Sequence, residues 1–117
     1  GEAGEAYNVA DWQLLPLRGI VEAVAAAAET DVDLVHACER ELAAGDLEPA
    51  DFPLYRDPPH VLSTAKLAAL GWEAVPVEDA VERTVDHVLD AYDADADLDA
   101  GPDRAAEARV LEILATM

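Results

Sequence analysis

The most constraining feature of the sequence is a stretch from 77 to 92 whose apolar residues recur at the spacing of an α-helix. One side of this helix would carry Val77, Ala80, Val81, Val85, Val88, Leu89 and Tyr92. The other side would carry the carboxylates Glu78, Asp79, Glu82, Asp86 and Asp90. The apolar side of such a helix faces a core. The sequence therefore predicts that 77–92 is a packing helix within a larger fold.

The N-terminal third of the chain predicts a small βαβ unit. Tyr7–Ala10 is a short strand candidate, and Asp31–Ala37 reads as a second strand. The residues between them predict a helix over Leu17–Ala28, with Pro16 near its first turn, where a missing N–H costs nothing. The two strands would be parallel. We therefore expect an α/β fold in which this unit is accompanied by packing helices.

The remaining segments predict one loop and two helical pieces. Glu39–Ala44 predicts a helical turn that Gly45 ends, and the proline-rich segment 46–62 predicts a shaped binding loop. Pro102 predicts the start of a last helix, which either docks on the domain or covers a partner subunit. The expected organisation is a domain over 1–92, an acidic linker over 93–101 and a C-terminal helix over 102–117.

The acidic balance limits the partners of this chain. It has 26 acidic and 7 basic residues and a net charge of −19. Such a surface repels nucleic acids and anionic membranes, so neither is expected as a partner. Because 52% of the residues are hydrophobic, the chain is not an acidic disordered tail. A folded protein that carboxylates keep soluble in concentrated salt explains both features, so we predict a halophilic source.

Cysteine usage and hydropathy indicate a cytoplasmic protein. Cys38 is the only cysteine, which excludes an intrachain disulfide. No segment resembles a signal peptide or is long and apolar enough to span a bilayer. The alternating aspartates of 93–101 resemble a calcium loop, but Leu98 and Arg104 stand where that loop needs glycine and glutamate. No metal site is expected.

Three blocks of sequence occur in the order typical of one enzyme family. The first is GEAYNVAD over 4–11, the second is STAKLAALGW over 63–72 after the loop 55–60, and the third is VPVEDAVERTV over 75–85. Together they resemble the C-terminal substrate domain of the extended short-chain dehydrogenase/reductases, the NAD-dependent nucleotide-sugar epimerases and dehydratases. The resemblance covers about 4–90 and implies the C-terminal part of a Rossmann-type fold.

The catalytic residues of that family are not found in this chain. The family uses a Tyr-x-x-x-Lys pair, but Leu62 stands four residues before Lys66, the only lysine. The resemblance implies a parent enzyme whose N-terminal Rossmann half binds NAD(P), whereas this part binds only a nucleotide sugar. We expect no catalytic or cofactor-binding residue here and an inactive fragment when it is alone, with a homodimer as one assembly that the sequence allows.

The resemblance also implies a set of substrate-binding residues. Arg56 matches the arginine that contacts the nucleotide diphosphate, and Asp57 and His60 stand where polar residues reach the ribose or phosphate. Tyr55 would stack on the base and Asn8 would orient the substrate loop. The alternatives are a loop arginine paired with a carboxylate, a structural tyrosine and an asparagine bonded to nearby backbone.

A second interpretation belongs to another functional class. The chain would be a stand-alone acidic protein-interaction module, without catalytic activity, that captures a partner by an exposed apolar patch. Substrate binding by Arg56 and an apolar surface that binds protein are distinguishable, because the first requires a nucleotide-sugar ligand and the second requires none.

Overall fold

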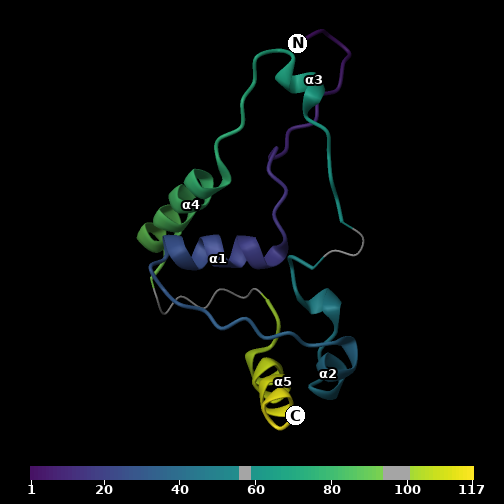
Figure 1. The fold of residues 1–117 in the computed structure, drawn as a ribbon, viewed down its shortest axis with the longest axis vertical. Helices are drawn as coiled ribbons and strands as arrows, with labels where there is room; N and C mark the ends of the chain where they lie inside the picture. Colours follow the sequence, from purple (N-terminus) through teal and green to yellow (C-terminus); the bar gives the residue numbers. More distant parts are fainter. Residues whose placement is uncertain (56–58, 94–100) are drawn as a thin grey trace. The chain divides into compact units, whose positions relative to one another are not determined.

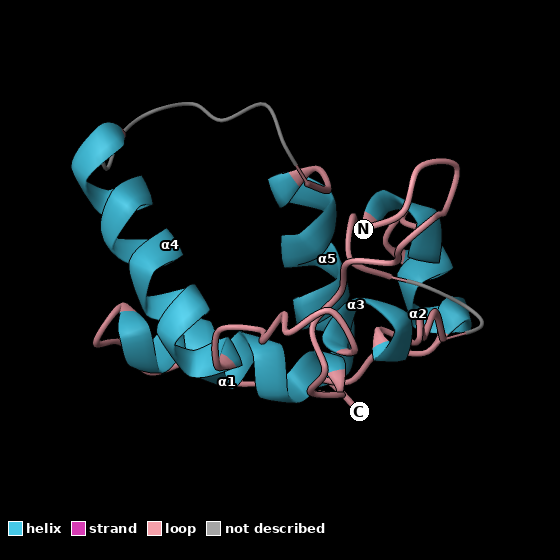
Figure 2. Cartoon of the chain, turned by 90° about the horizontal axis from the view of Figure 1, so that it is seen from above, coloured by secondary structure: helices cyan, strands magenta, loops and turns pink. Residues whose placement is uncertain are grey.

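The computed structural model describes residues 1–55, 59–93 and 101–117, and these residues form helices and loops only (Figure 1). The elements are α1 (Leu17–Ala27), α2 (Glu39–Ala44), the 3₁₀-helix η1 (Pro49–Asp51), α3 (Ala65–Ala68), α4 (Val77–Ala91) and α5 (Arg104–Ala115). Figure 2 shows the same helices joined by loops, with no strand in the described ranges.

The predicted α/β fold is therefore wrong, and with it the βαβ unit. Neither Tyr7–Ala10 nor Asp31–Ala37 forms a strand. Val9 is 70% exposed and Val35 is 56% exposed, so neither predicted strand buries these apolar side chains. A strand is stable only when a neighbouring strand pairs with it, and the described residues contain no such pairing.

The chain divides into two compact units, each described here by itself. Unit 1 contains the described residues 1–32 and 59–93, with α1, α3 and α4. Unit 2 contains the described residues 33–55 and 101–117, with α2, η1 and α5. The predicted acidic linker falls mainly on 94–100, outside the described residues.

Unit 1 is built on the packing of α1 against α4 (Figure 1). The predicted periodicity of 77–92 is confirmed as a helix, and Val77, Val81 and Val85 are half-buried along it. Ala25 of α1 is buried, 7% exposed. Gln13 joins the loop before α1 to the start of α4, because its Oε1 accepts a hydrogen bond from the Val77 backbone N at 2.8 Å.

The C-terminal end of α1 is a Schellman motif. Glu29 donates its backbone N–H to Ala26 O at 3.1 Å, and Thr30 donates to Ala25 O at 3.0 Å. Glu29 has a φ of 52°, in the left-handed region that usually selects glycine. The predicted helix over Leu17–Ala28 is thus confirmed to within one residue, although no glycine marks its end.

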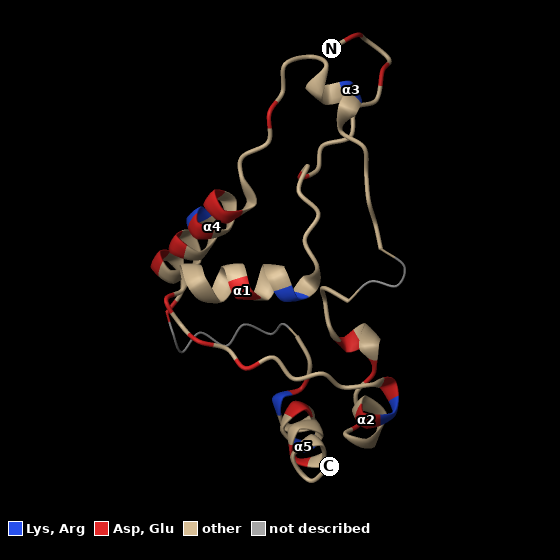
Figure 3. Ribbon diagram, in the orientation of Figure 1, with Lys and Arg blue, Asp and Glu red and all other residues tan. Residues whose placement is uncertain are grey.

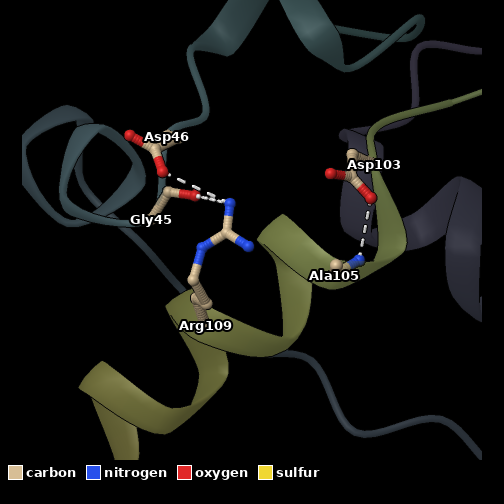
Figure 4. A network of polar contacts seen from close by, with 5 residues as sticks. All are labelled: Gly45, Asp46, Asp103, Ala105 and Arg109. Atoms are coloured by element: carbon tan, nitrogen blue, oxygen red, sulfur yellow. Dashed lines mark hydrogen bonds and ion pairs between the residues drawn. The ribbon is translucent and has the colours of Figure 1, made fainter.

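Unit 2 has a small core between α2 and α5. Its buried residues are Leu47, Ala106 and Val110, and the half-buried Leu42, Phe52 and Leu114 pack against them. The last helix therefore packs on α2 within unit 2, as the first of the two alternatives predicted. That it covers a partner subunit stays a prediction. It begins at Arg104 rather than at Pro102, because Asp103 caps it: Asp103 Oδ1 accepts from the Ala105 backbone N at 2.9 Å (Figure 4).

Two residues at the end of α2 have separate roles: Asp46 reverses the chain, and Gly45 leaves room for α5. Asp46, not Gly45, is the left-handed residue, with a φ of 65°. Gly45 has an ordinary φ of −98°, but a Cβ there would overlap the Val110 side chain and lie 3.3 Å from the Ala106 carbonyl O. Glycine thus allows α5 to approach α2. Arg109 strengthens this contact by donating to Gly45 O at 3.1 Å and to Asp46 Oδ2 at 3.3 Å (Figure 4).

Candidate functional site

The predicted substrate-binding residues fall into three groups. Arg56 and Asp57 lie outside the described residues. Asn8 and His60 are exposed side chains of unit 1. Tyr55 belongs to unit 2 and is 42% exposed. Their role in binding a nucleotide sugar stays a prediction.

Asn8 bonds to distant backbone. Its Nδ2 donates to the Ser63 carbonyl O at 3.2 Å, which ties the N-terminal segment to the residues before α3. Lys66 of α3 reinforces this link, because its ammonium group pairs with Glu5 and lies 5.1 Å from the centre of the Tyr7 ring. The only lysine is therefore already paired with a carboxylate. Gly71, three residues after the end of α3, has a φ of 89°, in the left-handed region that favours glycine.

Tyr55 lies at an open concavity of unit 2. Its lining residues are Glu39, Glu48, Pro49, Ala50, Phe52, Pro53 and Tyr55. The Tyr55 backbone N donates to Phe52 O at 3.0 Å, which closes a turn after η1. Among the described residues, its lining combines aromatic and proline surface with two carboxylates and includes no cationic side chain.

Glu41 fixes the start of α2. The Cys38 backbone N donates to Glu41 Oε2 at 2.7 Å. This bond lowers the pKa of Glu41, and the Cys38 side chain and the charge of Arg40 act in the same direction. A carboxylate at the first turn also favours the helix dipole. The perturbed group is thus a helix cap, and its role is structural.

A run of apolar side chains stands exposed before and at the start of α1. Its members are Val9, Trp12, Leu14, Leu15 and Leu17. Trp12 is 64% exposed and Leu14 is 71% exposed. We call residues 9–17 the apolar segment. Sequence reasoning placed Val9 in a strand and Leu17 in a packing helix, and it assigned no role to Trp12 or Leu14.

Where α1 and α4 meet, a groove opens beside their packed apolar faces. It is lined by Ala23, Ala26, Ala27, Ala28 and Glu29 from the C-terminal end of α1 and by Glu78, Glu82, Asp86 and Leu89 from α4. We call this the α1/α4 groove. The amphipathic pattern of 77–92 predicted the charged side of α4, but the position of α1 beside that side depends on tertiary packing.

Two searches of the described residues give negative results. No group of three or more histidine, cysteine, aspartate or glutamate side chains within them is arranged to hold a metal ion. None of the helices in the described ranges combines the length and the apolarity needed to cross a bilayer.

Neither a protein-family model, nor a curated protein, nor a solved structure matches this chain.

Proposed function

We propose that this chain is an acidic helical protein-interaction module that binds a partner protein through exposed apolar side chains and catalyses no reaction itself. The apolar segment is the observation that carries the proposal. Trp12 and Leu14 expose most of their surface within a single short stretch of chain. Scattered apolar residues are ordinary on a protein surface, whereas a cluster of large ones marks an interaction site.

The size of the exposed surface supports a protein partner. Tryptophan is the residue type most often found at energetic hot spots of interfaces. Covering the 64% of Trp12 that is exposed would contribute about 2–4 kcal/mol at 25 cal/mol per Å². Leu14, at 71% exposure, would add about 1–2 kcal/mol. These contributions are comparable with those of measured hot-spot residues, so the segment is suited to anchor an interface.

The nucleotide-sugar interpretation has less support. Its expected α/β fold is contradicted, Lys66 is paired with Glu5, and the described residues that line the Tyr55 concavity include two carboxylates and no cation. A diphosphate needs cationic or N–H donors. Binding by Arg56 remains a prediction, and the experiment below tests it beside the proposed function.

The test is retention of a partner by the tagged full chain in an extract of the source cells. The variant Trp12→Ser/Leu14→Ser removes the proposed anchors. A control variant, Leu111→Ser/Met117→Ser, removes two other exposed apolar side chains, which are 52% and 77% exposed. Quantitative mass spectrometry measures each recovered protein, and circular dichroism verifies that each variant is folded.

We expect the wild type and the control variant to retain the same protein in near-equimolar amount, and the Trp12/Leu14 variant to lose it. Equal recovery with both variants would contradict the proposal. Binding of UDP-glucose or dTDP-glucose in calorimetry, with loss in Arg56→Ala, would instead support the nucleotide-sugar interpretation.

A further inference from the structure

We infer that the α1/α4 groove binds an amphipathic helix of a partner protein that carries lysine or arginine at every fourth position beside a stripe of small apolar residues. This inference rests on the proposed function and adds a second surface and a partner chemistry to it. The groove belongs wholly to unit 1, and the two helices that line it, α1 and α4, pack against each other.

We call the alanine side chains that α1 contributes the floor of the groove, and their small size allows a third helix to pack closely. On the α1 side it is formed by Ala23, Ala26 and Ala27, whose side chains are single methyl groups. Packed helices approach to about 8–10 Å between their axes, and small residues at the contact allow the shorter distances. Leu89 on α4 adds an exposed apolar side chain, 63% exposed, at the edge of the floor. The floor therefore suits small and medium apolar residues of an incoming helix.

The carboxylates that α4 contributes, which we call the wall of the groove, form a regular charge pattern. Glu78, Glu82 and Asp86 are spaced by four residues along α4, so they form one row on the helix surface. From Glu78 to Asp86 the row spans about 12 Å at 1.5 Å per residue. In Figure 3 the acidic colour recurs along α4, while the C-terminal half of α1 is free of charge. Basic residues four apart on a partner helix have the same spacing as this row.

Nothing within the described residues neutralises the row. The ion pairs that the structure shows are formed by Arg18, Lys66, Arg104 and Arg109, and none of them involves a carboxylate of this wall. Arg83 precedes Asp86 by three residues, yet no ion pair joins them. The C-terminal end of α1 contributes a partial negative charge and Glu29 a full one at the same groove. The groove thus presents uncompensated negative charge to its occupant.

The charge selects the occupant. A second copy of this chain, with a net charge of −19, would place carboxylates against carboxylates. A purely apolar helix would remove three carboxylates from water without giving them a partner, which is costly. A basic amphipathic helix covers the alanine floor with its apolar side chains and also forms ion pairs with the row of carboxylates.

The probe is a pair of synthetic capped helical peptides built on alanine and leucine. One carries three lysines at spacing four beside the apolar stripe, and the other carries glutamates at the same positions. Titration of the full chain is followed by fluorescence anisotropy of the labelled peptide, at several salt concentrations within the range where circular dichroism shows the chain folded. We expect binding of the lysine peptide only, and an affinity that falls as salt rises.

The decisive variant is Glu78→Gln/Glu82→Gln/Asp86→Asn, which removes the row and keeps the shape of the side chains. We expect its Kd for the lysine peptide to rise about tenfold, from the summed effect of three exposed ion pairs. A second variant, Ala26→Leu, leaves the charge unchanged and fills the floor. It should also weaken binding, by about fivefold or more, if the partner helix lies in the groove.

The matched control is Glu2→Gln/Glu73→Gln/Asp93→Asn, which changes the net charge equally at exposed positions of unit 1 outside the groove and outside the apolar segment. Its Kd should change less than about twofold. Equal weakening by the row and control variants, or equal binding of both peptides, would overturn the inference. The proposed function would survive that result if the Trp12/Leu14 variant still lost its partner, because those residues lie outside the groove.

Discussion

Replacement of Gly45 by alanine tests the packing of unit 2 most sharply. A Cβ at this position would overlap the Val110 side chain and stand 3.3 Å from the Ala106 carbonyl O and the Val110 backbone N. Rotation of Val110 could relieve the overlap with its side chain, but the tight contacts with the backbone of α5 would remain. Overpacking of this kind costs about 1–3 kcal/mol. We therefore expect Gly45→Ala to destabilise the contact of α2 with α5, although its φ of −98° is accessible to alanine.

A double-mutant cycle separates the overlap from other effects. Val110→Ala alone removes two buried methyl groups and should cost about 2 kcal/mol. In Gly45→Ala/Val110→Ala the new methyl group enters the space that valine vacates. The double variant should therefore cost about 1–2 kcal/mol less than the sum of the single variants.

Hydrogen exchange of the amides of α5 measures these changes in the full chain. A loss of 1–3 kcal/mol accelerates exchange about 5- to 150-fold. The control is Gly19→Ala in α1, where the new Cβ meets Pro16 at an ordinary 3.6 Å and should stabilise that helix by about 0.5–1 kcal/mol. Unchanged exchange of α5 in Gly45→Ala, or additive costs in the double variant, would refute the reasoning.

Three further predictions concern helix ends and charge. Glu29→Gly should stabilise α1 by about 0.5–1 kcal/mol, measured by denaturant unfolding, because Glu29 has a positive φ; destabilisation would contradict the assigned turn. Asp46→Gly should gain less, because it relieves a positive φ but also loses the ion pair with Arg109. Because the folded-state pKa of Glu41 is lowered, its contribution to stability is complete above the ordinary range and is lost as the pH falls through the folded-state pKa. Acid should therefore unwind α2 in the wild type, whereas Glu41→Gln should show less of this pH dependence in exchange of the α2 amides. Dialysis to low salt should lower the melting temperature, since salt screens the repulsion of −19 charges; an unchanged melting temperature would contradict the halophilic prediction.

The main helices were predictable from local patterns, whereas the two predicted strands were wrong. The spacing of Val77, Val81 and Val85 predicted α4 because a buried face leaves a periodic record in the sequence. The apolar residues around Val9 and Val35 also suggested strands, but these side chains stay exposed and no neighbouring strand pairs with them in the described residues. A short run of β-favouring residues forms a strand only when tertiary structure supplies a partner strand.

The close approach of α2 to α5 and the ends of the helices were harder still to predict. Gly45 was predicted only to end a helix, whereas its lack of a side chain leaves room for Val110, which is distant in the sequence. Glu29 and Asp46 adopt the left-handed conformation without the glycine that normally signals it. The α1/α4 groove likewise depends on which helices pack together, and only the acidic side of α4 could be predicted from the sequence.

The most direct test of the central claim is an amide chemical-shift titration of the isotope-labelled full chain. UDP-glucose, dTDP-glucose and the lysine peptide are added separately, and the shifts are followed residue by residue. The proposed function predicts no shifts with either nucleotide sugar, and the inference of a helix-binding groove predicts shifts along α1 and α4 with the peptide. Shifts at Asn8, Tyr55 and His60 with a nucleotide sugar would contradict the proposed function, whereas no response to the peptide would overturn only the groove.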